Sequence, residues 1–577
     1  MVNVVIDGKE IHVPPKTTIL DAAKAAGIHV PTLCFLRNIN EIGACRICVV
    51  EVEGYERLFT ACNNPVEEGM IIHTNSRKAR EARRNNLLMI LSEHDVNCTL
   101  CVRSGNCELQ RISNELNIHD SPFRKQIDHR RTNADFPLIR DFSRCIKCMR
   151  CVQVCDNIQH TNVWDVVNTG QKAIVDVKGV YALEDSRCTL CGQCITHCPT
   201  AALIERDDTQ KVLDAIDDPE KIVLVQIAPA PRTAWGEEFG MKPQVATVNR
   251  LAAALRMAGI DYVFDTNFSA DLTIMEEGSE FIERLKNADS AEFPMFTSCC
   301  PGWVRYVKGH WPQFVDRLSS AKSPQQMFGA VAKTWYAQTL GVDPSRIFSV
   351  SVMPCLAKKA ECALPVMNSA GSGQDVDVAL TTREVGRLIR SLQIHPEVLK
   401  DEPLDMPFGI GSGAGAIFGA TGGVMEAALR SAYYLVTGKN AEPDAFKGVR
   451  GMEGWKEAEF DLAGKTLKVA VVNGLGNADA LLTALARGKV HYDFVEVMAC
   501  PGGCVGGGGQ PIHGHVEMAP LRAPTLYDID RHMKLRFSHE NPSIIRCYRE
   551  FLGKPLSERS HRLLHTTYHD WKLPGEK

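Results

Sequence analysis

Cysteine is the residue type in this sequence with the most potential chemistry, because 22 of the 577 residues are cysteines. Ten of them fall into short groupings in which two residues separate neighbouring thiols. In a large chain without a secretory leader, such CxxC groupings indicate metal sites rather than disulfides. Zinc ribbons present two CxxC pairs per site. Two of the groupings here are instead close triplets with a fourth cysteine trailing, which favours iron–sulfur clusters.

Five further cysteines stand at the ends of three apolar stretches, Glu292–Thr297, Ile347–Pro354 and Tyr492–Ala499. The cysteines are Cys299, Cys300, Cys355, Cys500 and Cys504. Because open α/β sheets bind ligands at the carboxyl ends of their strands, we expect these thiols to converge. Four thiols can hold one cubane cluster, which leaves one to spare. The alternative is that they are small buried core residues, as free cysteines often are.

Two consecutive runs between residues 145 and 198 have the C-x2-C-x2-C-x3-C spacing of bacterial two-cluster ferredoxins. In that arrangement the fourth cysteine of each run serves the other cluster. One [4Fe–4S] cluster is therefore expected on Cys145, Cys148, Cys151 and Cys198. The second is expected on Cys188, Cys191, Cys194 and Cys155.

The first 110 residues carry two more groupings. Cys34, Cys45, Cys48 and Cys62 resemble the ligands of a plant-type [2Fe–2S] ferredoxin with a lengthened first gap. His94, Cys98, Cys101 and Cys107 follow an H-x3-C-x2-C-x5-C spacing, in which the histidine can fill the position that three cysteines leave empty. Both groupings resemble modules shared by the large electron-input subunit of respiratory complex I and by modular hydrogenases.

Acidic residues form a second candidate for chemistry. The segment Met275–Arg284 is expected to be helical, so Glu277 and Glu280, three residues apart, can share one face. A thiol with a pKa of about 8.5 can exchange protons with such carboxylates near neutral pH. The alternative is an ordinary solvated acidic face.

The elements that must position these residues follow from the apolar pattern. Asp7-Gly8 predicts a tight hairpin turn, and Thr17 or Thr18 is expected to cap a helix through Gly27. A basic helix is expected from Arg77, with a solvated face favoured over a docking patch. From Lys221 onward, apolar runs alternate with helical stretches, the pattern of parallel sheets. The further runs are 222–227, 262–264, 376–380 and 467–472.

Two glycine-rich stretches, Gly411–Gly415 and Asn473–Gly476, lack the register of a dinucleotide-binding loop. We interpret them as places where backbone approaches a buried cluster. The polar residues 510–577 are expected to form a wrapping tail of short helices, with His532, His539 and His561 at the surface.

Composition excludes several classes of function. The net charge of −4 gives no reason to expect nucleic-acid or membrane-surface binding. The sequence contains no run of about 18 apolar residues, so no transmembrane helix is expected. The N-terminus lacks a secretory or twin-arginine signal, which predicts a cytoplasmic protein.

Three segments together resemble the signature segments of the [FeFe]-hydrogenases. They are Thr297–Trp303, Met353–Lys359 and Glu496–Cys504. The resemblance covers nearly the whole chain, and the layout is similar to the monomeric, ferredoxin-linked form with four accessory clusters. It implies an H-cluster, a [4Fe–4S] cubane joined through one thiolate to a diiron unit that carries CO, CN⁻ and a bridging azadithiolate.

The resemblance also implies roles for individual residues. Cys300, Cys355, Cys500 and Cys504 would hold the cubane, and Cys504 would bridge to the diiron unit. Cys299 would be the free thiol that hands protons to the azadithiolate amine, and Lys358 would hydrogen-bond a cyanide. Met353 and Met498 would pack beside the diiron unit, although methionines are also ordinary core filler. The family's proton path would run through Cys299, Glu277, Ser319, Glu280 and Arg284. Cys362 and Cys547 remain as unligated cysteines.

These inferences predict a multidomain α/β protein. Ferredoxin-like N-terminal iron–sulfur modules would precede a large catalytic domain of two parallel-sheet lobes around the active-site cluster. The expected domains are a [2Fe–2S] module at 1–78, a His/Cys3 [4Fe–4S] module at 79–125, a two-[4Fe–4S] module at 126–210 and the H-cluster domain at 211–577.

The expected activity is reversible H2 formation and oxidation with ferredoxin or flavodoxin as the electron partner, in a monomer matured by dedicated proteins. The segment Ala228-Pro-Ala230 places alanine where monomeric members tend to carry serine, which leaves open a catalytic subunit of a larger NAD(P)-linked hydrogenase. A non-catalytic H2 sensor or assembly factor and a complex I-like input subunit also remain open. The input subunit has no use for the five cysteines at the three strand ends.

Overall fold

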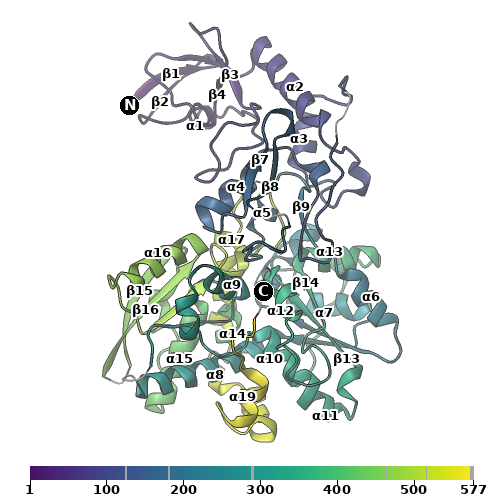
Figure 1. Cartoon of the computed structure of the whole chain (residues 1–577), viewed down its shortest axis with the longest axis vertical. Helices are drawn as coiled ribbons and strands as arrows, with labels where there is room; N and C mark the ends of the chain where they lie inside the picture. The colour runs from purple at the N-terminus through teal and green to yellow at the C-terminus, as the bar shows by residue number, and fades with distance from the viewer. Residues whose placement is uncertain are drawn as a thin grey trace.

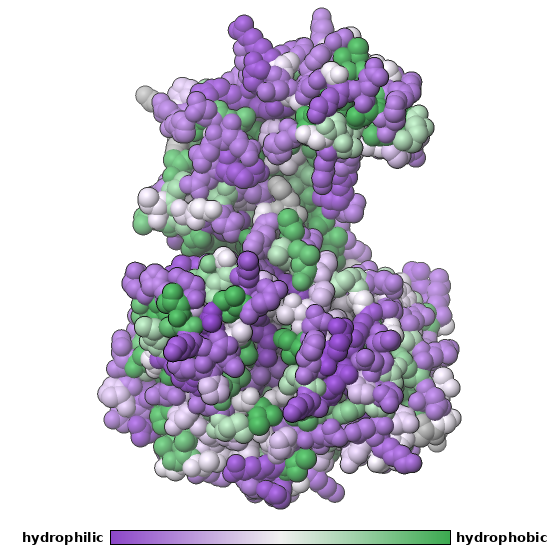
Figure 2. Space-filling model, turned by 180° about the vertical axis from the view of Figure 1, so that it is seen from behind, coloured by the Kyte–Doolittle hydropathy of each residue, from purple (hydrophilic) through white to green (hydrophobic). Residues whose placement is uncertain are grey.

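The computed structural model describes residues 1–123, 127–179, 182–287, 291–462, 464–514, 516–571 and 573. Small N-terminal modules are stacked on one side of a larger two-lobed domain (Figure 1). The view from behind shows a mainly hydrophilic surface and a narrower upper part (Figure 2). Within the described residues, none of the helices combines the length and the apolarity that crossing a lipid bilayer requires.

The first module is a five-stranded sheet with one helix packed on it. Its strands lie in the order β2-β1-β5-β3-β4. They are β1 (Val2–Ile6), β2 (Lys9–Val13), β3 (Val49–Val52), β4 (Phe59–Thr60) and β5 (Ile71–His73), and the helix is α1 (Ile19–Ala25). The predicted hairpin is confirmed: β1 and β2 pair antiparallel, and Asp7 and Gly8 adopt φ of 47° and 81° at the turn. Thr18 is the cap, since its hydroxyl accepts from the Asp21 N–H.

The second module consists of two helices, α2 (Arg77–Ser92) and α3 (Glu108–Glu115), around a short 3-10 turn at Cys98–Leu100. The expectation of a fully solvated basic face is wrong at Arg83. That side chain is 4% exposed and donates to the Val49 carbonyl at 2.7 Å, so it fastens α2 to the first module.

The third module carries the two ferredoxin-type runs. Two antiparallel ribbons frame it, and each run enters a short helix. The elements are β6 (Leu138–Arg140) with β9 (Leu203–Glu205), β7 (Trp164–Val167) with β8 (Ile174–Val177), and the helices α4 (Arg150–Gln153) and α5 (Gln193–Thr196). The residues that precede the two helices, Met149 and Gly192, are both left-handed, with φ of 65° and 73°. This repeated turn places the cysteines of both runs in equivalent positions.

The larger domain has two sheets, as the sequence predicts. The first is wholly parallel in the order β11-β10-β13-β14. Its strands are β10 (Ile222–Ile227), β11 (Tyr262–Asp265), β13 (Ile347–Met353) and β14 (Val378–Thr381). Helices of this lobe are α6 (Thr209–Asp217), α7 (Val248–Met257), α11 (Ala337–Leu340), α12 (Ala357–Cys362) and α13 (Thr382–Ser391).

The second sheet has the order β12-β17-β16-β15, with an antiparallel edge strand on three parallel ones. Its strands are β12 (Met295–Phe296), β15 (Trp455–Leu462), β16 (Lys465–Asn473) and β17 (Phe494–Met498). The helices of this lobe are α9 (Pro301–His310), α15 (Gly423–Thr437) and α16 (Leu475–Ala486).

Helix α8 (Thr266–Lys286) runs between the lobes and contacts α10 (Pro324–Val331), α14 (Gly413–Ile417) and α15. Its first thirteen residues are all buried. The tail then wraps the domain with α17 (Ala519–His532), α18 (Pro542–Cys547) and α19 (Glu558–Leu564), and α19 lies at the end of the domain away from the N-terminal modules (Figure 1).

Two expectations about glycines and histidines are wrong. A Cβ on Gly411 would lie 2.1 Å from the Asn267 Cβ, and one on Gly476 would lie 2.8 Å from the Ile158 carbonyl oxygen. Because these glycines have no side chain, the backbone can lie close to α8 and to the third module. Their close neighbours are therefore protein atoms rather than a cluster. His539 is not at the surface: it is 9% exposed, and its ring stacks on Tyr434 with a centroid distance of 4.0 Å. Burial lowers its pKa to about 4.

Candidate active site and cluster-binding sites

A cavity of about 70 Å³ lies between the two lobes, where the three cysteine-bearing strands end. The cysteines on its wall are Cys299, Cys300, Cys355 and Cys504, and Met353, Met498 and Lys358 complete the set of expected residues there. Cys300 directly precedes α9, whose first residue is Pro301, so the turn after β12 leads into a helix. The strand-end rule thus places these thiols at one sheet edge in each lobe.

Cys500 lies behind this wall, and the charges of Cys355 and Cys300 act on its thiol. Its pKa is raised far above the ordinary range, first by burial and then by these neighbouring thiolates. Several buried thiols that repel one another's ionised forms suit a cationic metal centre, because metal coordination removes the repulsion. The donor set at this cavity therefore fits an iron–sulfur cubane.

Lys358 supplies the positive charge of the cavity. Its Nζ donates to the Cys299 carbonyl oxygen and to Glu361 Oε2, both at 3.0 Å. Burial alone would lower its pKa, but the Glu361 carboxylate and the nearby thiolates outweigh burial and raise it. The ammonium group therefore stays charged at the cavity wall, where an anionic ligand would sit.

Helix α8 brings the expected proton-path residues into one row. Ser319 Oγ donates to Glu280 Oε2 at 2.7 Å, and Arg284 Nη2 donates to Glu280 Oε1 at 2.8 Å. Glu277 is fully buried, and it acts electrostatically on Cys299. Burial, followed by the negative charge of Glu280, raises the pKa of Glu277 to about 8. A solvated acidic face is therefore excluded for Glu277.

The sequence analysis did not identify the residues of the C-terminal tail that hydrogen-bond to this row and its neighbours. Tyr568 OH donates to the Ser319 carbonyl oxygen at 2.7 Å, and His565 lies between Ser320 Oγ at 2.8 Å and Glu276 Oε2 at 3.0 Å. No local signal points to them, because Tyr568 is 249 residues from Ser319 along the chain. The tail thus clamps the segment that carries Ser319.

The two ferredoxin runs are crossed in space. Cys145, Cys148, Cys151 and Cys198 line one cavity. Cys155 acts electrostatically on all three other thiols of the second set, Cys188, Cys191 and Cys194. Both groups join three cysteines of one run with the fourth of the other, which is the arrangement expected for two cubanes.

The two N-terminal sets also gather. Cys34 with Cys45, and Cys48 with Cys62, lie within hydrogen-bonding range of one another. In the second module, His94, Cys98 and Cys107 line one cavity of about 380 Å³, and the charge of Cys101 acts on Cys107. The donors fit a [2Fe–2S] and a His/Cys3 [4Fe–4S] cluster, respectively.

Backbone contacts connect these sites in a series. Asn40 Nδ2 donates to the carbonyl oxygens of Cys34 at 2.8 Å and Cys148 at 2.9 Å. Cys107 Sγ lies 3.6 Å from the Pro199 carbonyl oxygen. Cys500 Sγ lies 3.7 Å from the Cys191 carbonyl oxygen. Both N-terminal sites therefore adjoin the cavity of Cys148 and Cys198, and the second ferredoxin set adjoins the active-site cavity.

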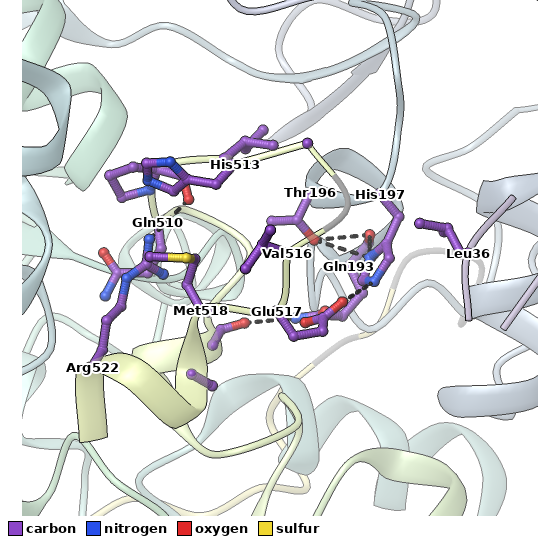
Figure 3. A pocket seen from close by; sticks show the side chains of 16 residues that line it. Leu36, Gln193, Thr196, His197, Gln510, His513, Val516, Glu517, Met518 and Arg522 are labelled. Carbon is purple, nitrogen blue, oxygen red and sulfur yellow. Dashed lines mark hydrogen bonds and ion pairs between the residues drawn. The ribbon is translucent and has the colours of Figure 1, made fainter. Parts of the chain in front are cut away.

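A further pocket lies where the third module meets the catalytic domain (Figure 3). His197 contacts Glu517 at 2.9 Å, and Gln193 Nε2 donates to the Gly506 carbonyl oxygen at 2.9 Å. Arg522 Nε donates to Glu237 at 2.8 Å on the opposite side. These contacts fix the last ferredoxin set against the loop that carries Cys504.

Five known family descriptions match the chain in consecutive order. They are the 2Fe-2S iron–sulfur cluster binding domain (1–77), the NADH-ubiquinone oxidoreductase-G iron–sulfur binding region (83–122), the 4Fe-4S dicluster domain (144–202), the C-terminal domain of the iron only hydrogenase large subunit (221–508) and the iron hydrogenase small subunit (517–571).

Two similar proteins match almost the whole length of this chain, and a similar solved structure matches about two thirds of it. The chain is 48% identical to "NADP-reducing hydrogenase subunit HndD" of Solidesulfovibrio fructosivorans, over 98% of this chain and 99% of that protein. It is 41% identical to "Iron hydrogenase 1" of Clostridium pasteurianum, over 98% and 100%. The solved structure of a single-residue variant of apo [FeFe]-hydrogenase HydA1 from Chlamydomonas reinhardtii is 40% identical with a TM-score of 0.55, over 64% of this chain and 99% of that one.

Proposed function

The chain belongs to the iron-only, or [FeFe], hydrogenase family, and we propose that it interconverts H2 with protons and electrons at the cavity between its two lobes. One observation carries the proposal. A buried thiol, Cys299, faces the cavity and is followed by a row of acidic and hydroxyl groups that leads away from it. A sensor or an input subunit has no need of such a row.

We assign the cofactor ligands by motif and placement. Cys300, Cys355, Cys500 and Cys504 would hold the cubane of the H-cluster, and Cys504 would also be the thiolate that joins it to the diiron unit. When bound, the H-cluster supplies the iron centre at which H2 forms or is cleaved. Met353 and Met498, which line the cavity, would pack against it, and Lys358 would donate a hydrogen bond to one of its cyanide ligands.

The protons would follow the row that Glu277, Glu280 and Arg284 of α8 form with Cys299 and Ser319. Cys299 exchanges a proton at Sγ with the buried carboxyl group of Glu277, which is protonated at neutral pH because its pKa lies near 8. Ser319 and Glu280 continue the transfer outward through their 2.7 Å hydrogen bond. Arg284, which is paired with Glu280, stands at the outer end of the row.

The electrons use the four accessory sites. The [2Fe–2S] site of Cys34, Cys45, Cys48 and Cys62 and the site of His94, Cys98, Cys101 and Cys107 are two entrances. Both lead to the cubane of Cys145, Cys148, Cys151 and Cys198, then to that of Cys155, Cys188, Cys191 and Cys194. The module limits that go with these sites are 1–78, 79–125, 126–210 and 211–577, and the limit at 125 and 126 lies outside the described residues.

Ferredoxin or flavodoxin is one candidate electron partner, with the protein acting as a monomer after maturation by dedicated enzymes. The second candidate is an NAD(P)-linked assembly in which this chain is the catalytic subunit. Two observations favour the second. The relative at 48% identity is named as a subunit of an NADP-reducing hydrogenase, and Ala228 and Ala230 line the cavity without a hydroxyl group.

The test is an H2-evolution assay on anaerobically matured protein. Reduced viologen should drive H2 formation, and reduced ferredoxin should do so in the first case but only weakly in the second. NAD(P)H should drive it only when further subunits are added. Absence of H2 with viologen, in protein that carries its full iron content, would leave the sensor as the better assignment.

A further inference from the structure

A buried arginine at the junction of the two electron entrances lacks partners for part of its guanidinium group. Arg140 is the last residue of β6 and is 1% exposed. Its Nε and Nη2 are buried and have no hydrogen-bond partner among the described residues. Unsatisfied donors of a buried cation are costly, so the structure calls for a partner at this place.

The partner has to lie on the side of the cluster cavity. Arg140 lines the cavity of Cys145, Cys148, Cys151 and Cys198 together with these four thiols. Cys145 and Cys151 exert the largest electrostatic attractions on its guanidinium group. Aromatic rings also cover the group. Its central carbon, Cζ, lies 4.7 Å from the centroid of the Phe142 ring and 5.5 Å from that of the Trp164 ring.

Its charge is also not neutralised. Arg150, another arginine buried near this cavity, is paired with both carboxylate oxygens of Glu108 at 2.8 Å. Arg140 forms no ion pair with any carboxylate in the part of the chain that the structure describes. A full positive charge therefore acts at short range, in a medium of low dielectric constant, on whatever the four thiols hold.

We propose that Arg140 is a tuning residue for the cubane of Cys145, Cys148, Cys151 and Cys198, and that its N–H groups and charge raise the reduction potential of that cluster. The proposal rests on the ligand assignment made under the proposed function. Reduction adds one negative charge to the cluster, so an uncompensated cation and N–H donors toward its sulfur atoms favour the reduced form. Electrons from both entrances would then collect at this cluster before they move inward.

The test is an EPR-monitored redox titration of the full-length, cluster-loaded protein and of Arg140→Leu. The signal of this cluster is identified as the one that Cys145→Ser alters. At the wild-type midpoint potential, the ratio of reduced to oxidised cluster should fall about tenfold or more in Arg140→Leu, which is a shift of about 59 mV for one electron. The other signals should keep their midpoints. Arg140→Lys should recover part of the shift, because it restores the charge without the planar group.

Arg130→Leu is the matched control. Arg130 lies over the same Phe142 ring at 4.5 Å, but it is exposed and paired with Asp128 at 2.6 Å. It should leave every midpoint unchanged. The proposal is overturned if Arg140→Leu holds its full iron and the ratio of reduced to oxidised cluster, at the wild-type midpoint potential, changes less than twofold. It is also overturned if neither Arg140→Leu nor Arg140→Gln can load the cluster, since the role is then structural. Wild-type protein without this signal would instead refute the ligand assignment.

Discussion

At the scale of single residues, the proposed proton path depends most on the carboxyl group of Glu277. Its carboxyl group is fully buried next to a second carboxyl group, and both effects oppose ionisation. The pKa of about 8 means that the group is protonated at pH 7 and can donate, whereas an ordinary glutamate would be ionised. Burial thus prepares a proton donor from a residue type that is usually a base at this pH.

This gives a prediction for the pH dependence of H2 formation. Donation requires the protonated form, so the rate with reduced viologen should fall as the pH rises through about 8. Glu277→Gln cannot transfer a proton and should lose about 100-fold or more in rate at every pH, with its iron content unchanged. Glu283→Gln, on the exposed face of the same helix, is the control and should match the wild type. An active Glu277→Gln variant would remove Glu277 from the path.

At the scale of elements, the crossing of the two ferredoxin runs follows from their repeated turn. Each run enters its helix through a left-handed residue, Met149 or Gly192, and this brings the last cysteine of one run to the first three of the other. The ligand sets therefore cannot be separated by cutting the sequence between the runs.

The crossing predicts which variants share a spectroscopic effect. Cys198→Ser and Cys145→Ser should alter the same EPR signal although they belong to different runs, because both thiols line one cavity. Cys194→Ser, from the same run as Cys198, should alter a different signal. If Cys198→Ser and Cys194→Ser changed one common signal, each run would hold its own cluster and the assignment would be wrong.

The tail is the element that holds the proton row in place. Besides the bond from Tyr568 to Ser319, the Lys322 N–H donates to the Leu564 carbonyl oxygen at 2.8 Å and the Thr566 N–H donates to the Ser320 carbonyl oxygen at 2.8 Å. The two backbone bonds flank an antiparallel bridge between Ala321 and His565, so the position of Ser319 depends on residues near the chain end.

Tyr568→Phe should separate this positioning role from general stability. Loss of one buried hydrogen bond costs about 1 kcal/mol of unfolding free energy. Turnover should also fall severalfold, since Ser319 is less well held. Tyr306→Phe removes a comparable bond, from Tyr306 OH to Asp479 at 3.0 Å, away from the row. It should lower the melting temperature to a similar extent without lowering turnover. Equal turnover in both variants would contradict the positioning role of the tail.

At the scale of the whole molecule, the modules form a chain of contacts from two entrances to one cavity. The N-terminal part and the two-lobed part meet through the third module (Figure 1). The contact between Cys500 and the Cys191 carbonyl, together with the pocket around His197, fixes that meeting point. In the function that we propose, electrons and protons would therefore approach the cavity through separate groups of residues.

The sequence was sufficient for features that a local pattern encodes. The strand ends before Cys299, Cys355 and Cys500 and the crossed ferredoxin sets follow from spacing alone, because each motif is short and contains its own turn. Contacts between distant segments were not predictable. The tail clamp on Ser319 and the burial of Arg83 depend on which segments meet in space. The glycines near Gly411 were misinterpreted for the same reason, since Asn267, which they admit, lies far away in the sequence.

The central claim is that Cys299 stays free of metal and carries protons beside a centre held by the other cysteines. Infrared spectra and H2 turnover, measured on the same samples of matured wild-type protein and Cys299→Ala, test it most directly. The account predicts CO and CN⁻ bands in both samples and H2 formation only in the wild type. Loss of the bands in Cys299→Ala would show that Cys299 is a ligand, and undiminished turnover in that variant would show that protons take another way; either result would contradict the account.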